Sequence, residues 1–277
     1  MNRVAIFGLG LIGGSLALAL RARRADIAVQ AIDHRAVLGH EAARAAVHEL
    51  ISVDDAKAVE AAVRAADLVV LAAPVRAICN ALPGVLDAAG AVTDCGSTKR
   101  AIADVAAASA RRSRFVPGHP MAGRPGSGIE QASADLFEGR RWIVCAEASA
   151  PDAVDTVEAL IRIVGAQPVR MTVAEHDRAV ALTSHVPQLV ASALKVLAAR
   201  RNAEPAAGPA FASATRVAGG SDAMWGDIFA TNADEVASAL RDLATELEQA
   251  AVELEQTPAA PARVLELLGK ARALRGG

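Results

Sequence analysis

The sequence predicts an α/β domain built on a doubly wound, mostly parallel sheet, followed by an all-helical domain. In the first half of the chain, short apolar runs alternate with helical stretches, a pattern typical of βαβ units. Beyond about residue 172 the strand signals stop, and apolar residues recur at helical spacing. A chain of 277 residues is also long for one hydrophobic core. We therefore expect two domains, at residues 1–172 and 173–277.

The expected strands of the first domain end in Pro, Gly, Asp or Ser, residue types that interrupt regular structure. Residues 3–7 form the first expected strand, and 11–23 the helix that follows it. A strand at 27–33 precedes an alanine-rich helix from about His40. The later elements are apolar runs at 66–74, 90–97, 114–120 and 141–146, a helix at about 151–164 and a strand at 167–172.

The second domain is expected to contain helices only. Helical spacing begins near residue 174 and continues past Pro187, which we expect to bend the helix. A loop at 201–209 separates it from a long helix at 234–256 with interleaved charges. A short break at 257–261 then leads to a last helix. The alanine richness of the chain favours these helices.

Composition excludes several classes of function. Hydrophobic residues make up 53% and charged residues 22%, as in a globular protein. A net charge of -2 argues against nucleic acid or an anionic membrane as a partner. No apolar run reaches ~18 uncharged residues, and the N-terminus does not resemble a signal peptide, so we expect no membrane span. The three cysteines include no C-x-x-C pair, which fits a reduced, cytoplasmic setting. The six histidines lack H-E-x-x-H spacing and close cysteine neighbours, so no metal site is expected.

The stretch “VAIFGLGLIGGSLA” places three glycines in G-x-G-x-x-G spacing between a strand and a helix. Gly8 allows a tight turn, Gly10 lets a pyrophosphate approach the backbone, and Gly13 lets the helix pack closely on the sheet. The N-terminus of that helix, at Leu11 and Ile12, would face the phosphates. The motif predicts a Rossmann-like dinucleotide site. A tight turn without a ligand is the alternative.

Asp33 ends the second expected strand, twenty residues after Gly13. An acidic residue there binds the ribose hydroxyls of a dinucleotide. Its carboxylate would repel a 2′-phosphate, so NAD is favoured over NADP. Arg35 lies two residues on and is able to hold such a phosphate, which keeps NADP as the alternative. FAD is less favoured, because nothing indicates an isoalloxazine pocket.

Ligands of a doubly wound sheet bind at the carboxyl ends of its strands. Ala73 and Pro74 occupy one such end, beside the expected cofactor. Ser97 follows another and, taken alone, is more typical of a helix N-cap than of a catalytic group. His119 lies in “GHPMAG” at a third, where loop hydrogen bonding and catalysis are equally supported.

The helical half adds four candidates. His176 reads as a solvated helix position, and His185 as a hydrogen-bonded core histidine. Arg216 precedes two glycines near a helix end, where it would hold a carboxylate or form a surface ion pair. Trp225 belongs either to the core or to the wall of a pocket.

Five stretches of the chain together resemble the prephenate/arogenate dehydrogenase family of tyrosine biosynthesis. They occur in the family's order and cover most of the chain. The resemblance implies a nucleotide-binding domain and a helical domain that forms an intertwined homodimer. The matching stretches are “GLGLIGGSLA”, “TDCGSTK”, “GHPMAG…SG…A…LF”, “HDRAVALTSHVP” and “TRVAGG…MWGDIFATN”.

The resemblance also implies a reaction, the NAD-dependent oxidative decarboxylation of prephenate to 4-hydroxyphenylpyruvate. His119 would accept the hydroxyl proton as the hydride leaves, a role that suits an imidazole. Ser97 would bind the same hydroxyl, orient His119 and lie next to the cofactor. Arg216 would hold a substrate carboxylate, with His185 and Trp225 lining the substrate side of the cleft.

The chain departs from the family directly after “GHPMAG”. Many members carry a small or hydroxyl residue and then glutamate there, whereas this chain has Arg124 and Pro125. We place Arg124 at the substrate, where its charge would disfavour the ammonium group of arogenate, so prephenate is favoured. Arogenate and an amino-prephenate stay open as alternatives. So do a β-hydroxyacid dehydrogenase that uses Lys195 as its base, and a silent dinucleotide sensor.

Overall fold

The first half of the chain builds a six-stranded sheet with strand order β3-β2-β1-β4-β5-β6, and every pairing in it is parallel. This order and the intervening helices confirm the predicted doubly wound class. The structure, a computed structural model, describes residues 1–124, 126–256 and 261–274. The strands are β1 (Arg3–Phe7), β2 (Ala28–Asp33), β3 (Glu49–Ser52), β4 (Leu68–Leu71), β5 (Val92–Asp94) and β6 (Phe115–Val116).

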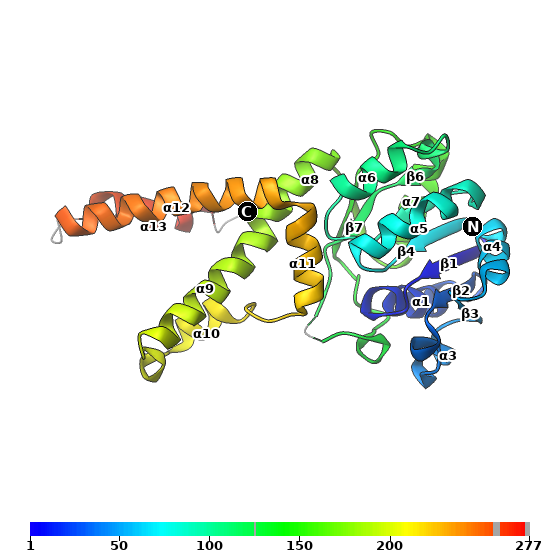
Figure 1. The fold of residues 1–277 in the computed structure, drawn as a ribbon, viewed down its shortest axis with the longest axis horizontal. Coiled ribbons are helices and arrows are strands. Elements are labelled where there is room, and N and C mark those ends of the chain that lie inside the picture. Colours follow the sequence, from blue (N-terminus) through cyan, green and yellow to red (C-terminus); the bar gives the residue numbers. More distant parts are fainter. Residues whose placement is uncertain (125, 257–260, 275–277) are drawn as a thin grey trace.

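Helices cover both faces of this sheet (Figure 1). Val4 and Ile6 of β1 belong to one hydrophobic cluster and Ala5 to the other, because side chains along a strand alternate between faces. The first cluster includes residues of α1 (Leu11–Arg23), α3 (Glu41–Ala46) and α7 (Pro151–Ile163). The second includes residues of α4 (Ala56–Ala65), α5 (Val75–Ala88) and α6 (Arg100–Ala107). Short helical segments are α2 (Arg35–Leu38), η1 (Arg112–Arg114) and η2 (Ile129–Gln131).

The single strand expected at 114–120 is divided between two sheets. Its first part is β6, and its second part belongs to a separate, three-stranded sheet. The order of this sheet is β7-β8-β9, with β7 antiparallel to β8 and β8 parallel to β9. The expected strand divides at Pro117, which has no backbone N–H to donate to a neighbouring strand. The N–H of Gly118 then bonds to the side-chain carboxylate of Asp94 rather than to a backbone carbonyl of β5. The strands are β7 (Gly118–Pro120), β8 (Arg141–Val144) and β9 (Gln167–Arg170).

The second half is helical, as predicted, and extends away from the sheets as two arms (Figure 1). Thr172 begins it with a capping box, in which Glu175 reaches back to the Thr172 backbone. α12 pairs with α13 in one arm, and α9 with α10 in the other. The elements are α8 (Val173–Val180), the π-helix η3 (Ala181–His185), α9 (Val186–Arg200), η4 (Glu204–Ala206), α10 (Pro209–Thr215), α11 (Asp222–Thr231), α12 (Ala233–Gln256) and α13 (Ala262–Ala273). Most of the break expected at 257–261 lies outside the described residues.

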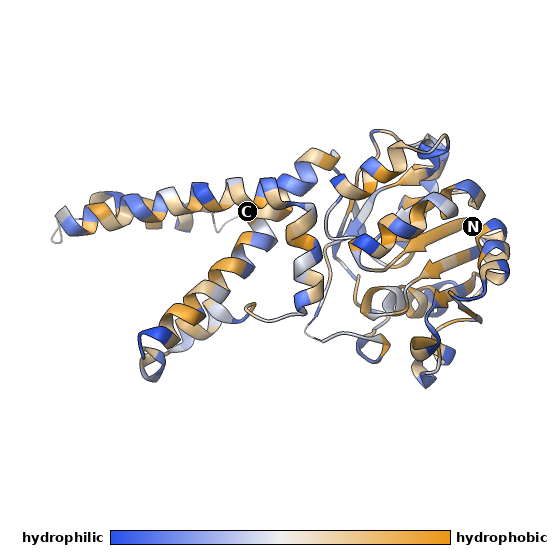
Figure 2. Cartoon of the chain, in the orientation of Figure 1, coloured by the Kyte–Doolittle hydropathy of each residue, from blue (hydrophilic) through white to orange (hydrophobic). Residues whose placement is uncertain are grey.

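The arms carry apolar side chains on their surfaces (Figure 2). Leu197 on α9 and Leu247 on α12 are 49% and 56% exposed. The continuous run Val173–Arg200 is also long and apolar enough to cross a membrane by length and composition, with a mean hydropathy of 1.3 and 33% of that window buried. Arg178 and Lys195 interrupt this segment, so it contains no uncharged run of ~18 residues. Its first turns hold His176 and Asp177, fully buried against the α/β domain.

Candidate active site

The turn between β1 and α1 leaves space beside Gly10 and none beside its neighbours. Gly8 has φ +90, and a Cβ there would lie 2.4 Å from the Ala72 carbonyl oxygen. A Cβ on Gly13 would lie 1.9 Å from the carbonyl oxygen of Gly8. A Cβ on Gly10 would meet nothing within 4 Å. Gly10 is also the N-cap of α1 and supplies no side chain to its N–H groups, so this end of the helix fits a pyrophosphate.

Asp33 lies beside this turn, at the carboxyl end of β2. Its two carboxylate oxygens accept hydrogen bonds from the N–H groups of Leu9 and His34, each at 2.6 Å. These bonds fix a negative charge where a ribose would bind. Arg35, the residue that would favour NADP, is 79% exposed, and its Nε lies 3.7 Å from Asp54.

The other expected cofactor residues surround the same strand ends. Leu11 and Ile12 are half-buried in the first turn of α1. Ala73 and Pro74 follow β4, which pairs with β1, and Pro74 is the N-cap of α5. The structure therefore brings these four residues to the edge of the sheet at which Gly10 and Asp33 lie.

A fully buried ion pair fixes the backbone in front of His119. The Lys99 ammonium donates to the Asp94 carboxylate and, at 2.7 Å, to the carbonyl oxygen of Gly118. The other oxygen of Asp94 accepts from the Gly118 N–H at 3.0 Å. Both polar groups of Gly118 are thus held from β5 and the loop after it. The sequence analysis assigned no role to Lys99, and the structure gives it one in positioning the histidine loop.

His119 contacts His176 rather than Ser97. Its Nδ1 lies 2.9 Å from His176 Nε2, and His176 Nδ1 lies 2.7 Å from Asp177 Oδ1. Among the described residues, no hydrogen bond joins Ser97 to His119. The helix-capping interpretation of Ser97 is wrong, because α6 begins at Arg100 and the Asp177 carboxylate accepts from the first N–H groups of that helix. The half-buried Ser97 hydroxyl is left available to a ligand.

Burial favours the neutral forms of His119 and His185 by lowering the pKa of each. It lowers the pKa of His119 well below the ordinary histidine value, and repulsion from His176, Lys99 and His185 lowers it further. Burial also lowers the pKa of His185 to about 4, although the Asp177 charge opposes this shift. A neutral imidazole has one nitrogen free to accept a proton, as a general base requires.

His185 is buried against two aromatic side chains of α11. The π-helical turn that contains it ends beside Pro187, which cannot donate a backbone hydrogen bond. Its ring lies 6.2 Å from that of Trp225, which stacks on Phe229 at 5.4 Å. Asn232 Nδ2 lies 3.4 Å from His185 Nδ1 and donates to the carbonyl oxygen of Asp177 at 2.8 Å. His185 and Trp225 are therefore neighbours on the helical side of the site.

Neither of the two expected substrate arginines forms a hydrogen bond or ion pair with these aromatic residues in the part of the chain that the structure describes. Arg216 follows α10, is exposed, and forms no ion pair within the described part of the chain. Arg124 is 39% exposed, and its guanidinium lies 3.8 Å from Asp135. Pro125 lies outside the described residues. Lys195, the base of the β-hydroxyacid alternative, is exposed on α9.

Sequence reasoning missed the role of His176 and Asp177. Both are fully buried, so the interpretation of His176 as a solvated helix position is wrong. A signal was present, because Val180 lies four residues after His176 and shares its helix face. A further buried group, Asn232, lies at the end of α11. Its side chain donates to the backbone of Asp177 and so connects α11 to α8.

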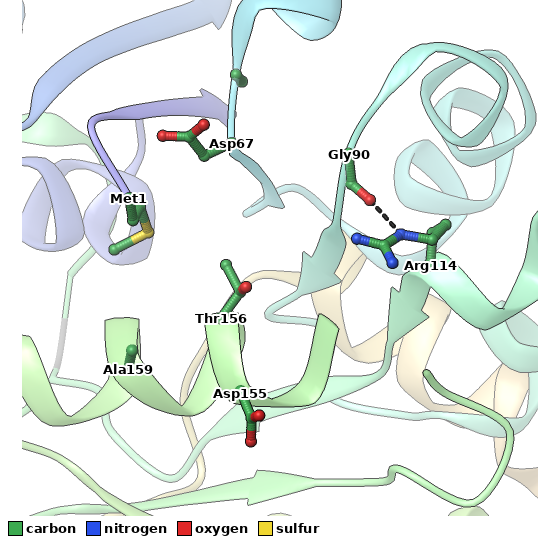
Figure 3. A pocket seen from close by; sticks show the side chains of 8 residues that line it. Met1, Asp67, Gly90, Arg114, Asp155, Thr156 and Ala159 are labelled. Atoms are coloured by element: carbon green, nitrogen blue, oxygen red, sulfur yellow. Dashed lines mark hydrogen bonds between the residues drawn. The ribbon is translucent and has the colours of Figure 1, made fainter. Parts of the chain in front are cut away.

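A surface hollow of about 560 Å³ lies among Met1, Asp67, Gly90, Arg114 and Thr156 (Figure 3). These residues precede or begin strands or belong to α7, at the edge of the sheet opposite the glycine turn. Among the described residues, no three or more His, Cys, Asp or Glu side chains are grouped to hold a metal ion.

Comparisons with known proteins agree with this arrangement. Residues 16–170 match the family model “Prephenate dehydrogenase, nucleotide-binding domain”, and residues 172–268 match “Prephenate dehydrogenase, dimerization domain”. The chain is 33% identical to a prephenate dehydrogenase of Bacillus subtilis over 85% of its own length and 65% of that relative. It is 30% identical to a cyclohexadienyl dehydrogenase of Zymomonas mobilis over 86% of the chain and 84% of that relative.

A solved structure of the same kind is similar over nearly the whole chain. It is a prephenate dehydrogenase from A. aeolicus in complex with hydroxyphenyl propionate and NAD+, with a TM-score of 0.86 and 26% identity. The similarity covers 99% of this chain and 97% of that one. The chain thus spans about two thirds of the length of the Bacillus relative but nearly all of the A. aeolicus chain.

Proposed function

We propose that this chain, which belongs to the prephenate dehydrogenase family, oxidatively decarboxylates prephenate to 4-hydroxyphenylpyruvate with NAD as the hydride acceptor. The observation that carries this proposal is a half-buried histidine, His119, whose neighbour Gly118 is held at the carboxyl end of β5, in the sheet that also carries the glycine turn. Its depressed pKa leaves it neutral and able to accept a proton. We propose that residues 1–172 bind the dinucleotide and that residues 173–277 bind substrate and a second subunit.

The residues at the glycine turn fit NAD. The open position at Gly10 and the N-terminus of α1 would receive the pyrophosphate, and Asp33 the ribose hydroxyls. Ala73 and Pro74 would lie beside the same ligand. When bound, NAD supplies the nicotinamide carbon that accepts the hydride. Arg35 lies near Asp54, which supports NAD over NADP.

His119 would act on the hydroxyl of the substrate ring. As the carbinol C–H pair leaves as hydride, the O–H bond breaks and the proton bonds to His119. The ring carboxylate then leaves as carbon dioxide, and its electron pair completes the aromatic ring. The phenol oxygen takes the proton back, so the base is regenerated within one turnover. Ser97, whose hydroxyl is available, would donate a hydrogen bond to the same oxygen.

Substrate binding is assigned to the helical side of the site. His185 and Trp225 would form its wall, and Arg216 would reach a substrate carboxylate from the loop after α10. Arg124 supports prephenate over arogenate only through its charge, which Asp135 at 3.8 Å partly offsets. Arogenate, or broad cyclohexadienyl specificity, is therefore the alternative. The ratio of kcat/KM for prephenate and arogenate distinguishes them.

The proposed reaction is tested by following NADH absorbance and carbon dioxide release with prephenate. We expect both products in equal amounts from the unaltered protein. His119→Asn should lower kcat roughly 10²–10⁴-fold with NADH binding kept, because it removes the base. His48→Asn is a matched control, since this exposed histidine accepts only a backbone N–H from Val29. Absence of NADH formation, or an unchanged kcat in His119→Asn, would contradict the assignment.

We also propose that the chain works as a homodimer in the cytoplasm, without nucleic acid or membrane partners. The exposed leucines of the two helical arms support a second subunit. The three cysteines are free, which agrees with a reduced setting.

A further inference from the structure

Three side chains from two domains form one hydrogen-bonded row behind the site. Asp177 Oδ1 lies 2.7 Å from His176 Nδ1, and His176 Nε2 lies 2.9 Å from His119 Nδ1. Asp177 and His176 are fully buried on α8, and His119 lies on β7. The two imidazole rings meet edge to face, with centroids 5.1 Å apart and planes at 67°. The proposed reaction assigns no role to His176 or Asp177.

The row ends in a stabilised negative charge. Burial alone would raise the pKa of Asp177, but hydrogen bonds from the His176 side chain and from the N–H groups of Arg100 and Lys99 lower it. Those N–H groups lie 2.8 Å from its two oxygens and belong to the start of α6, the positive end of the helix dipole. Asp177 is therefore a carboxylate that only accepts hydrogen bonds.

This fixed charge determines where the protons lie along the row. Because a carboxylate only accepts, His176 must carry its proton on Nδ1. Its other nitrogen, Nε2, faces His119 Nδ1 at 2.9 Å, so an N–H on His119 Nδ1 completes the row when Nε2 acts as the acceptor. His119 is left with an unprotonated Nε2. That is the nitrogen a base needs, on the side of the ring away from His176.

We propose that Asp177 and His176 are positioning residues that hold His119 in its Nδ1–H form and take up positive charge when His119 Nε2 is protonated. The proposal rests on the function proposed above. The substrate O–H bond breaks and an N–H bond forms at Nε2 of His119. The Nδ1 proton of His119 can then move to Nε2 of His176, beside Asp177. Both shifts reverse when the phenol oxygen takes its proton back, so no further reactant is needed.

The surroundings explain why such a pair is needed. Burial opposes a positive charge on His119, and His176 and Lys99, which lies in the β5–α6 loop, add to this effect. Asp94 is neutralised by its contact with Lys99. Asp177 is thus the carboxylate that is linked to His119 through hydrogen bonds. Its link to His119 passes through the side chain of His176.

Two substitutions of His176 separate the two parts of this role. In His176→Gln, an amide oxygen can still accept from His119 Nδ1 but cannot take up a proton. In His176→Leu, the acceptor is lost as well. We expect kcat to fall roughly 10–100-fold in the first and roughly 10²–10⁴-fold in the second. KM for prephenate and the Kd for NADH should stay within about threefold, because neither ligand contacts His176 in this assignment.

The nitrogen-15 NMR spectrum of the imidazoles provides a readout that does not depend on activity. In the unaltered protein and in His176→Gln, His119 Nε2 should show the shift of an unprotonated nitrogen at pH 7.5. In His176→Leu it should move towards the average of the two tautomers. A protonated Nε2 in the unaltered protein, or equal kcat in all three proteins, would overturn the proposal. Failure of prephenate turnover would reject the proposed function instead, and the NMR result would still decide the tautomer.

Discussion

At the scale of single residues, Gly118 is held by a buried ion pair in addition to the pairing of its strand, β7, with β8. Lys99 and Asp94 are both fully buried, and together they bind the carbonyl and the N–H of Gly118. A buried ion pair contributes little net stability, but losing one partner leaves the other charge uncompensated. The loop that presents His119 therefore depends on both residues being present.

Replacing Lys99 with methionine should destabilise the protein strongly. The change keeps a long apolar side chain but leaves the Asp94 carboxylate without its counter-charge, at a cost of about 3–5 kcal/mol. Urea unfolding at pH 7.5 measures this loss. Lys57→Met is the matched control, because Lys57 is exposed on α4 and should change stability by less than about 0.5 kcal/mol. Equal stability of the two variants would contradict the structural role of Lys99.

His185 should make stability depend on pH. Its pKa is about 4 in the folded protein, against roughly 6.5 in an unfolded chain, so the unfolded state binds more protons between these values. The contribution of neutral His185 to the free energy of unfolding is fully present above about pH 6.5 and is lost as the pH falls towards 4. Between pH 7.5 and 5 this one group should account for on the order of 2 kcal/mol. His119 acts in the same direction, so the measurement is the difference in pH dependence between the unaltered protein and His185→Gln. Parallel urea-unfolding profiles would reject it.

At the scale of elements, two glycines of the same turn are expected to affect different properties. Gly13 should affect stability, and Gly10 should affect ligand binding. Gly13→Ala would force a Cβ against the Gly8 carbonyl, 1.9 Å away, and should cost about 1–3 kcal/mol or more. Gly10→Ala meets no protein atom and should leave stability within about 0.5 kcal/mol. It should nevertheless weaken NADH binding roughly tenfold or more, because the methyl group would occupy the space proposed for the pyrophosphate.

Gly84→Ala provides the control for both changes. Gly84 lies in α5, and a Cβ there also meets nothing within 4 Å. This variant should keep NADH binding and gain about 0.5–1 kcal/mol, the usual benefit of alanine in a helix. Thermal unfolding and fluorescence titration with NADH measure the two effects. Normal NADH binding by Gly10→Ala would place the ligand elsewhere.

The elements that could be predicted are those with long, regular patterns. β1, α1, β2 and α12 agree with the residues expected from periodicity to within a residue. β3 escaped notice because “ELIS” is a short edge strand with no clear alternation. The division of 114–120 into β6 and β7 depends on Asp94, which bonds to Gly118 across 24 residues. Contacts of this kind have no local signal.

The candidate site shows the same division. The glycines and Asp33 were predictable, because the motif is contiguous and its spacing reflects one turn. His119 was recognised through its loop and the family resemblance, but its partner was not, since His176 lies 57 residues further on. Asp177 caps α6 from 77 or 78 residues away. The spacing within α8 indicated that His176 and Val180 share a helix face. It did not indicate which part of the molecule that face packs against.

At the scale of the whole molecule, the two halves differ in how they bury apolar surface. In the described chain, every exposed large apolar side chain except Met121 lies after residue 172. α9 and α12 each carry several of them along arms that lie apart from the α/β domain (Figures 1 and 2). Contiguous exposed apolar surface of this kind marks a protein–protein interface. A second copy with the same arms supplies a matching surface, because a twofold interface is self-complementary.

The unaltered protein should therefore be a dimer at micromolar concentration, as measured by light scattering after size-exclusion chromatography. The double change Leu194→Glu and Leu197→Glu places two charges on one face of α9, where burial in an interface would leave them unpaired. We expect it to halve the measured mass or to cause aggregation. Ala61→Glu, on the exposed face of α4 in the α/β domain, should remain dimeric. A monomeric unaltered protein, or a double variant with unchanged mass, would show that these arms are covered in another way.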